Sequence, residues 1–550
     1  MGAMARAASQ VKAGTILALA LAAAAVVVPF SLRGIACGHD LSFHMNGWME
    51  VAQQWREGVI YPRWAGQANY GGGEPRFLFY PPLSWILGGA LGEVVPWLFV
   101  PVAFDICAIF LAGLAMHAGA REWFSEPDAT LIAVAYAINP YMLLTVYVRS
   151  AFAELLAASL LPLMVLWIVR DRPARQLFLP LAVTVAAAWL TNVPAAILMT
   201  YAAVVLLAAM TVLRRNSRVF LFGAGAIVLG LALAAFYIVP VLYEKNWITL
   251  GQVLSAGARP SDNFLFARTG EIQHDRFLGR LSWLAVCELA VTILAIFAAR
   301  SWRKSRPKLW WSLIILAVMS LFLMLPVSGW AYRLMPDLRF VQFPWRWLLI
   351  LSAAYAVFMV AAVRRFRGKS WFYAVCFAAL IASCNLMLQA HCDPADTPFM
   401  ISNLYHIGYG YMGTDEYVPA GGDNYEIKPD FPQFRLRGAD GGALPAGSKA
   451  TVLHWSTYRK QLTVESSQPL QVELRLMNYP AWQATRNGSR IGLGSDELTG
   501  RMVLAVPAGH SELDVRFVRT PDLWLGDGIS LVALIFLGGF WYVERDRRNR

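Results

Sequence analysis

The sequence predicts a polytopic α-helical membrane protein that carries one small β-rich domain outside the lipid. Of its 550 residues, 57% are hydrophobic and only 15% are charged, and the mean hydropathy is +0.48. A soluble chain has roughly 25% charged residues. The apolar residues gather in runs of about 20, the length that crosses a bilayer. After the last internal run, an alternating pattern typical of β-strands replaces them.

The apolar runs predict about a dozen transmembrane helices. A further segment, Pro81–Val95, is apolar but too short to span, and we expect it to form a helix that lies at the outer surface or dips into it. The predicted spans lie near residues 13–32, 97–119, 128–147, 151–169, 175–191, 194–213, 219–242, 282–299, 309–327, 345–363, 371–390 and 523–543.

Lysine and arginine predict the orientation of these spans. The formal net charge is +12, and the basic residues gather in every second loop. Cytoplasmic loops of membrane proteins carry such an excess. The pattern therefore places both termini in the cytoplasm, and it explains the basic character of the chain without a nucleic-acid partner. The basic loops are residues 170–175, 214–218, 300–308 and 364–369, together with the tail 545–550.

The same reading divides the chain into three parts. Residues 1–390 form a membrane domain with a long first outer loop at 33–96. Residues 391–521 form an extracytoplasmic β-rich domain, and residues 522–550 form the last transmembrane helix and a basic tail. Cys37 and Cys392 both fall outside the membrane, where disulfides form, so we predict a bond between them.

Strand-like alternation and one turn signal predict a small β-sandwich in the outer domain. Asn487-Gly488 is a strong hairpin signal, because type I′ turns need positive φ at both central residues. The alternating segments are Ala450–Trp455, Lys460–Glu465, Leu470–Leu476 and Leu513–Val518.

The first outer loop contains an acid between two histidines. Asp40 can take a proton from an acceptor hydroxyl or hold a cation. His39 and His44 can bind phosphate, shuttle protons or ligate a metal. Aromatic residues follow in the same loop, including Trp48 and Trp64. The alternative is a solvated loop whose aromatics mark the membrane interface.

Further charged residues are predicted at the outer ends of the helices. Glu154 should lie about a turn inside the membrane, where an ionisable group is costly. Its structural alternative is an ion pair with Arg149 that only fixes the helix ends. Arg346 follows Pro344 and can grip a phosphate bidentately, or simply snorkel to the interface. With Glu244, these residues place acids and phosphate-binding bases on the outer side.

This layout resembles the GT-C superfamily of membrane glycosyltransferases, which have a long first outer loop with an acidic residue soon after the first helix. It also resembles bacterial and archaeal membrane proteins named for a "6-pyruvoyl-tetrahydropterin synthase-related" region, although nothing in the sequence supports pterin chemistry. The Tyr479–Trp482 stretch is also similar to large bacterial membrane proteins linked to glycosylation of cell-surface polymers. The stretches that match the pterin-synthase-related proteins are Gly38–His44, Tyr61–Trp64, Phe79–Leu83, Asn139–Tyr141, Tyr147–Glu154, Gln342–Arg346, Glu416–Pro419 and Tyr479–Trp482.

The resemblance implies a GT-C-like fold in a prokaryotic cell membrane, and transfer of sugar from a polyprenyl-phosphate donor in the bilayer to an extracytoplasmic glycan, lipid or protein. Asp40 falls at the family's acidic position and is the expected base or metal-holding carboxylate. Metal dependence stays open, with Asp40 and His44 as the candidates for a divalent cation. The other expected roles are donor-phosphate binding for His39, His44, Arg149 and Arg346, supporting acids for Glu154 and Glu244, and sugar stacking for Trp48, Trp64 and Tyr80.

Two other classes of function stay open. A transporter or flippase of lipid-linked saccharides often has two similar halves with a site at the midplane. The sequence has no such halves, and its acids lie near one face. A non-catalytic membrane scaffold would use the β-domain to bind a partner, and Asp40 would then tolerate replacement.

Overall fold

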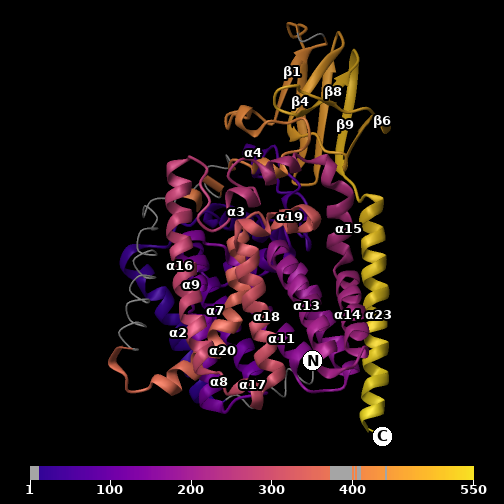
Figure 1. The fold of residues 1–550 in the computed structure, drawn as a ribbon. Coiled ribbons are helices and arrows are strands. Elements are labelled where there is room, and N and C mark those ends of the chain that lie inside the picture. The colour runs from indigo at the N-terminus through magenta and orange to yellow at the C-terminus, as the bar shows by residue number, and fades with distance from the viewer. Residues whose placement is uncertain (1–11, 372–398, 402, 405–409, 440–441, 550) are drawn as a thin grey trace.

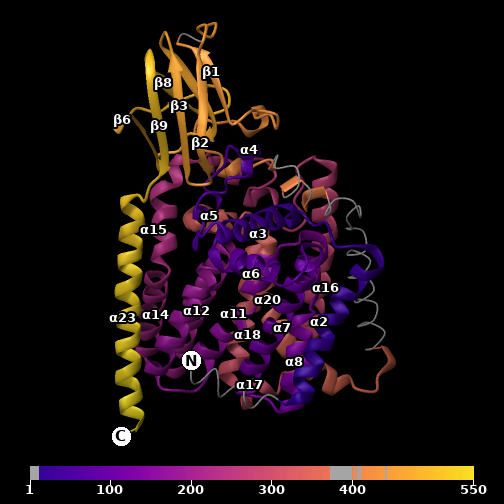
Figure 2. The ribbon, with the colours of Figure 1, turned by 180° about the vertical axis from the view of Figure 1, so that it is seen from behind.

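A computed structural model describes residues 12–371, 399–401, 403–404, 410–439 and 442–549. A bundle of helices forms one part, and two small β-sheets stand on one end of that bundle (Figure 1). The last helix, α23 (Pro521–Asn549), runs from the β-sheets down the side of the bundle to the far end (Figures 1 and 2). The β-strands are thus joined to the membrane helices on both sides.

Among the described residues, nine helices are long and apolar enough to cross a membrane. This is a multi-pass membrane protein. The spans are Ala13–Ser31 in α2 (Ala13–Arg33), Trp97–Ala120 in α7 (Val100–Ala120), Glu126–Arg149 through α8 (Glu126–Ala137), α9 (Pro140–Leu144) and η2 (Thr145–Arg149), Phe152–Val169 through α10 (Phe152–Ala157) and α11 (Leu160–Val169), α13 (Val193–Arg214), α16 (Ile272–Ala298), α18 (Pro307–Met324), Pro344–Phe366 in η9 (Pro344–Trp347) and α20 (Leu348–Phe366), and Pro521–Arg547 in α23.

Two of the predicted spans differ from this set, and a third is not described. The predicted span 219–242 is a broken helix, because α14 (Arg218–Leu233) and α15 (Ala235–Glu244) meet at 72°. The predicted span 175–191 is a shorter apolar helix, which includes α12 (Phe178–Trp189). The predicted span 371–390 lies outside the described residues, apart from its first residue.

The first outer loop is largely helical, which the sequence did not predict. Its longest helix, α3 (Leu41–Arg56), lies across the end of the bundle beneath the β-sheets (Figure 2). Two short helices follow, α4 (Ala68–Gly71) and α5 (Arg76–Phe79). The loop ends in α6 (Pro82–Gly92), and this is the one short apolar helix that the sequence did predict in the loop, near Pro81–Val95.

The β-strands form a four-stranded sheet, β1-β4-β8-β7, and a five-stranded sheet, β2-β3-β9-β5-β6. Leu462 and Val515 from one sheet share a single core with Val472 and Leu504 from the other, as in a sandwich. The strands are β1 (Phe434–Gly438), β2 (Lys449–Ser456), β3 (Arg459–Ser466), β4 (Leu470–Met477), β5 (Trp482–Arg486), β6 (Ser489–Ile491), β7 (Gly494–Ser495), β8 (Arg501–Val506) and β9 (Gly509–Phe517).

The predicted strands and turn are confirmed. The four alternating segments correspond to β2, β3, β4 and β9. Asn487 and Gly488 join β5 to β6 with φ of 48° and 80°, as a type I′ turn requires. The sequence did not predict the other strands, of which β6 and β7 are very short.

The start of α2 and the end of α23 lie on the same side of the bundle. The hydroxyl of Thr15 in α2 is 3.2 Å from the carboxylate of Glu126, at the start of α8, and α8 begins at the end opposite the β-sheets (Figure 1). Cys37, on the β-sheet side, is disulfide-bonded, while Cys392, its expected partner, lies outside the described residues.

The basic loops predict that the end of the bundle opposite the β-sheets faces the cytoplasm. A reporter inserted between Asp171 and Pro173 should therefore read cytoplasmic, and one inserted at Asn487-Gly488 should read extracytoplasmic. Paired alkaline phosphatase and fluorescent protein fusions measure this. The same signal at both positions would exclude the predicted topology.

Candidate functional site

Four charged residues from four separate segments meet at the ends of the helices nearest the β-sheets, which are the ends predicted to face outward. Arg149, at the end of η2, lies 2.5 Å from the Glu154 carboxylate of α10 and 4.0 Å from that of Asp40. Arg346, from η9, lies 3.3 Å from the same Glu154 oxygen. We call Asp40, Arg149, Glu154 and Arg346 the charged cluster. It contains two acids and two bases, so its formal charges balance when both acids are ionised.

Glu154 is the centre of this cluster. Besides both guanidinium groups, its carboxylate accepts a hydrogen bond from the hydroxyl of the buried Tyr141. The side chains of Arg149, Glu154 and Arg346 are only 4%, 2% and 8% exposed. A buried carboxylate needs such partners, because an unpaired charge away from water is very costly. Glu154 therefore holds the two guanidinium groups side by side.

Asp40 is the accessible member of the cluster. Its side chain is 41% exposed, so a hydroxyl group from outside can reach it. Desolvation by surrounding protein raises the pKa of the Asp40 carboxyl, while the charges of Arg149 and Arg346 lower it. Water at the exposed side of the carboxyl limits this shift. The result is a carboxylate with a raised pKa beside two cations, which suits a general base.

Backbone contacts fix Asp40 beside Arg149. The Asp40 backbone N–H donates to the Arg149 carbonyl at 2.9 Å, and the Gly38 N–H donates to the Ser150 hydroxyl at 3.0 Å. A Cβ atom at Gly38 would lie 2.2 Å from the Arg149 carbonyl carbon, so this approach requires glycine. Ser150 itself adopts a left-handed φ of 49° at the end of η2. The first loop is thereby attached to the turn between two spans.

Aromatic rings support both arginines. The Arg149 guanidinium lies 4.8 Å from the centre of the Trp345 ring, and that of Arg346 lies 4.7 Å from the Phe343 ring. Arg346 also donates to the Val341 carbonyl at 2.7 Å. Such stacking suits the planar guanidinium group and orients it. The sequence did not predict roles for Tyr141 and Trp345, although both lie in stretches that were matched to the pterin-synthase-related proteins.

A second group of buried charged residues fixes helix α3. Asp40 directly precedes the first residue of this helix. Arg76 pairs with Glu74 at 2.7 Å and donates to the Phe43 carbonyl at 3.2 Å. The Tyr411 hydroxyl donates to Glu50 at 2.7 Å. Burial raises the pKa of Glu50 to about 7, against the hydrogen bond from Tyr411 that lowers it. These contacts connect α3 with the segment that leads into the β-sheets.

Three of the residues with predicted binding roles are buried. Trp48 stacks on Phe104 with ring centres 4.9 Å apart, and Trp64 packs edge-on against Trp482. Both tryptophans are fully buried, so neither presents a face to a sugar in this structure. His44 is buried among aromatic rings, and desolvation lowers its pKa to about 3. A neutral, enclosed imidazole is a poor phosphate ligand.

Among the other predicted residues, His39 and Tyr80 are accessible to a ligand, whereas Glu244 lies away from the charged cluster. His39 is exposed, and its ring lies 5.4 Å from that of Phe277 in α16. Tyr80 is partly exposed, and desolvation and the nearby charge of Asp40 raise its pKa. Glu244 bonds instead to Tyr479 and Thr520, at the base of the β-sheets.

A divalent cation does not fit the charged cluster well. Hard cations take several oxygen ligands, most often carboxylates. Asp40 offers one open carboxylate, whereas Glu154 is already bound by two guanidinium groups. His44 faces aromatic rings. In the part of the chain that the structure describes, no group of three or more His, Cys, Asp or Glu residues is suited to holding a metal ion.

Solved membrane glycosyltransferases share part of this architecture. Arabinofuranosyltransferase AftD from Mycobacteria aligns with a TM-score of 0.43 and 19% identity over 70% of this chain and 28% of AftD. Oligosaccharyltransferase AglB from Archaeoglobus fulgidus, solved with an inhibitory peptide and a dolichol-phosphate, aligns with a TM-score of 0.37 and 14% identity over 74% of this chain and 56% of AglB. Likeness at these scores carries no functional conclusion.

No protein-family model and no curated protein matches the sequence. The resemblance to the pterin-synthase-related proteins therefore gains no support from these comparisons.

Replacing Glu154 by glutamine should destabilise the protein strongly. The change keeps an acceptor for Tyr141 but leaves Arg149 and Arg346 buried without their counter-charge, a loss that typically costs about 3–5 kcal/mol. Thermal unfolding in detergent measures this, with the partly exposed Asp40→Asn as the matched control. Equal melting temperatures for the two variants would show that Glu154 does not hold the cluster together.

Proposed function

We propose that this protein is a GT-C-type glycosyltransferase that moves a sugar from a polyprenyl-phosphate donor to an acceptor outside the cytoplasm. The charged cluster is the observation that carries this proposal. It lies at the outer ends of membrane helices, where a lipid-linked phosphate would present its sugar. It combines two oriented cations with one accessible carboxylate. The acceptor is an extracytoplasmic glycan, lipid or protein.

Arg149 and Arg346 are the proposed partners of the donor phosphate. Guanidinium groups bind phosphate oxygens bidentately. The Glu154 carboxylate and the Trp345 and Phe343 rings already orient them, so binding costs little reorganisation. Negative charge that develops on the leaving phosphate is stabilised by cations held in place before the reaction.

The proposed reaction is a direct displacement at the anomeric carbon. The bond between that carbon and the phosphate oxygen breaks, and a bond to the acceptor oxygen forms. The acceptor hydroxyl gives its proton to the Asp40 carboxylate, and the lipid phosphate leaves with the bonding electron pair. His39 and Tyr80, both with exposed atoms near Asp40, are the proposed contacts for the sugar and its phosphate.

Replacing Asp40 by asparagine should abolish most of the transfer. Asparagine keeps the shape but is a poor base, and loss of a general base typically costs about 10²–10⁴-fold in rate. As pH decreases, the wild-type rate should fall when Asp40 becomes protonated. Because the pKa of Asp40 is raised, this fall should begin at a higher pH than for an ordinary aspartate. The variant should lack this acid limb of the pH profile. Transfer from synthetic polyprenyl-phosphate sugars by purified protein measures both effects.

The control for this experiment is Asp430→Asn, which changes an exposed acid beside the β-sheets. It should transfer sugar at the wild-type rate. If Asp40→Asn is also as active as the wild type, Asp40 is not the base. If neither the wild type nor the control transfers sugar from any donor, the protein is better interpreted as a flippase or a non-catalytic scaffold.

Replacing Arg346 by lysine should raise the KM for the lipid donor. Lysine keeps the positive charge but loses the planar fork and its stacking on Phe343. Loss of a hydrogen bond to a charged group costs about 1.5–3 kcal/mol, or roughly tenfold to a hundredfold in affinity. Arg364→Lys, which alters an exposed arginine paired with Asp128, is the matched control. An unchanged KM in both variants would reject a role for Arg346 in donor binding.

A further inference from the structure

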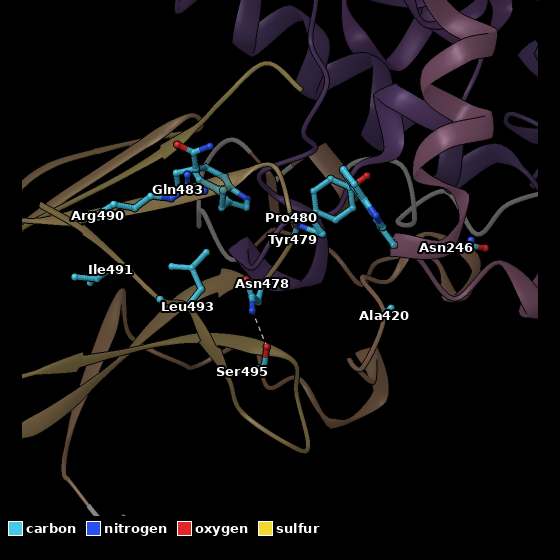
Figure 3. A pocket seen from close by; sticks show the side chains of 13 residues that line it. Asn246, Ala420, Asn478, Tyr479, Pro480, Gln483, Arg490, Ile491, Leu493 and Ser495 are labelled. Atoms are coloured by element: carbon cyan, nitrogen blue, oxygen red, sulfur yellow. Dashed lines mark hydrogen bonds between the residues drawn. The ribbon is translucent and has the colours of Figure 1, made fainter. Parts of the chain in front are cut away.

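A pocket of about 540 Å³ lies where the membrane helices meet the β-sheets (Figure 3). The membrane side contributes η4 (Lys245–Trp247), which follows the bent helix α15. The β side contributes the turn Asn478–Pro480 and residues of β5, β6 and β7. This volume falls in the range of small-ligand sites, about 300–1,000 Å³. None of the predicted site residues lines it, so it is separate from the charged cluster.

Several polar side chains of this pocket have no partner within the protein. Asn246, Gln483 and Arg490 line it, and among the described residues their side chains take part in no hydrogen bond or ion pair (Figure 3). Asn478 is partly engaged, because it donates to the Ser495 hydroxyl at 2.7 Å. The free amides offer both donors and acceptors, and the guanidinium offers donors only.

A buried donor without an acceptor adds an independent sign of a ligand. Trp482 lines the pocket and is only 1% exposed, yet its indole N–H has no hydrogen-bond partner. Buried polar groups in proteins are almost always paired, so each exception calls for an explanation. Because Trp482 lines the pocket, an acceptor atom of a bound molecule is one explanation for this unpaired N–H.

From these features we infer that the pocket binds an oligosaccharide, either neutral or acidic. Sugar hydroxyl groups donate and accept hydrogen bonds, as the free amides require. The C–H face of a sugar ring packs on aromatic rings, and the half-buried Trp247 offers one, set against Tyr479 at 5.5 Å. The lining contains one arginine and no acid, which disfavours a cationic ligand.

The pocket is held rigidly before any ligand binds. The Tyr479 and Thr520 hydroxyls both donate to the buried Glu244 carboxylate at the outer end of α15. Trp482 packs edge-on against Trp64 and Phe517. A preformed site loses little entropy on binding. The pocket and the charged cluster lie on the same side of the membrane, so on the proposed function the bound saccharide is the acceptor.

Binding of linear hexasaccharides of glucose, mannose, arabinose and glucuronic acid to the full-length protein in detergent tests this inference. Intrinsic tryptophan fluorescence should show saturable binding of at least one of them. Trp247→Ala and Gln483→Ala should each raise its Kd by roughly tenfold or more. Arg486→Ala is the matched control, because it changes a neighbouring residue of β5 that does not line the pocket, and it should bind as the wild type does.

Binding and catalysis are separated by the variant Asp40→Asn, which should bind the hexasaccharide with unchanged affinity. If binding persists but no sugar is transferred by the wild type, the proposed function fails while the pocket stands. No saturable binding, equal Kd values in pocket and control variants, or binding only of a peptide with the same fluorescence change would overturn the inference.

Discussion

A single buried carboxylate ties together the outer ends of the helices. Glu154 binds Arg149 and Arg346 at once and also accepts the Tyr141 hydroxyl. Away from water each of these charges would be very costly alone, so the contacts are made together or not at all. The turn after η2, the start of α10 and the start of α20 are thereby held in one arrangement. Asp40 is then placed by backbone contacts to that arrangement rather than by its own side chain.

Six of the eight stretches that were matched to the pterin-synthase-related proteins meet at two places in the structure. Asn139–Tyr141, Tyr147–Glu154 and Gln342–Arg346 surround the charged cluster, and Gly38–His44 brings Asp40 to it. Tyr61–Trp64 and Tyr479–Trp482 meet instead at the base of the β-sheets, where Trp64 touches both Tyr479 and Trp482. One group of stretches therefore builds the candidate site, and the other attaches the β-sheets above it.

Much of the fold could be predicted from the sequence, because it depends on properties that each segment carries alone. Hydropathy and length identify a membrane helix, and alternation with Asn487-Gly488 identifies strands and their turn. The site was predicted in part for the same reason, since a charge such as Glu154 inside a span is already anomalous. Tyr141 and Trp345 were missed because the sequence does not distinguish the roles of a tyrosine or tryptophan near a helix end. Such a residue can pack in the core, anchor the helix at the membrane interface or orient an arginine.

The errors in the first outer loop have one physical cause. Aromatic side chains are common both at a membrane interface and in a protein core, and the sequence does not distinguish the two. Trp48 and Trp64 belong to a core because α3 packs onto the bundle and Trp64 inserts beneath the β-sheets. That packing depends on contacts between segments far apart in the chain, such as Tyr411 with Glu50. In the proposed pocket at the junction, the half-buried Trp247 offers an aromatic face for a sugar ring instead.

The junction between bundle and β-sheets links the two proposed sites mechanically. Glu244 attaches the pocket to α15, and Glu50 and Arg76 attach α3, with Asp40 at its start, to the segment that leads into β1. On the proposed function, a lipid-linked donor would reach the charged cluster from the bilayer, whereas a saccharide held in the pocket would reach it from the side of the β-sheets. The two reactants would then meet only if the pocket and the charged cluster keep a fixed distance and orientation to each other. The buried, hydrogen-bonded carboxyl groups of Glu50 and Glu244 at the junction contribute that rigidity, since breaking these contacts would leave buried polar groups without partners.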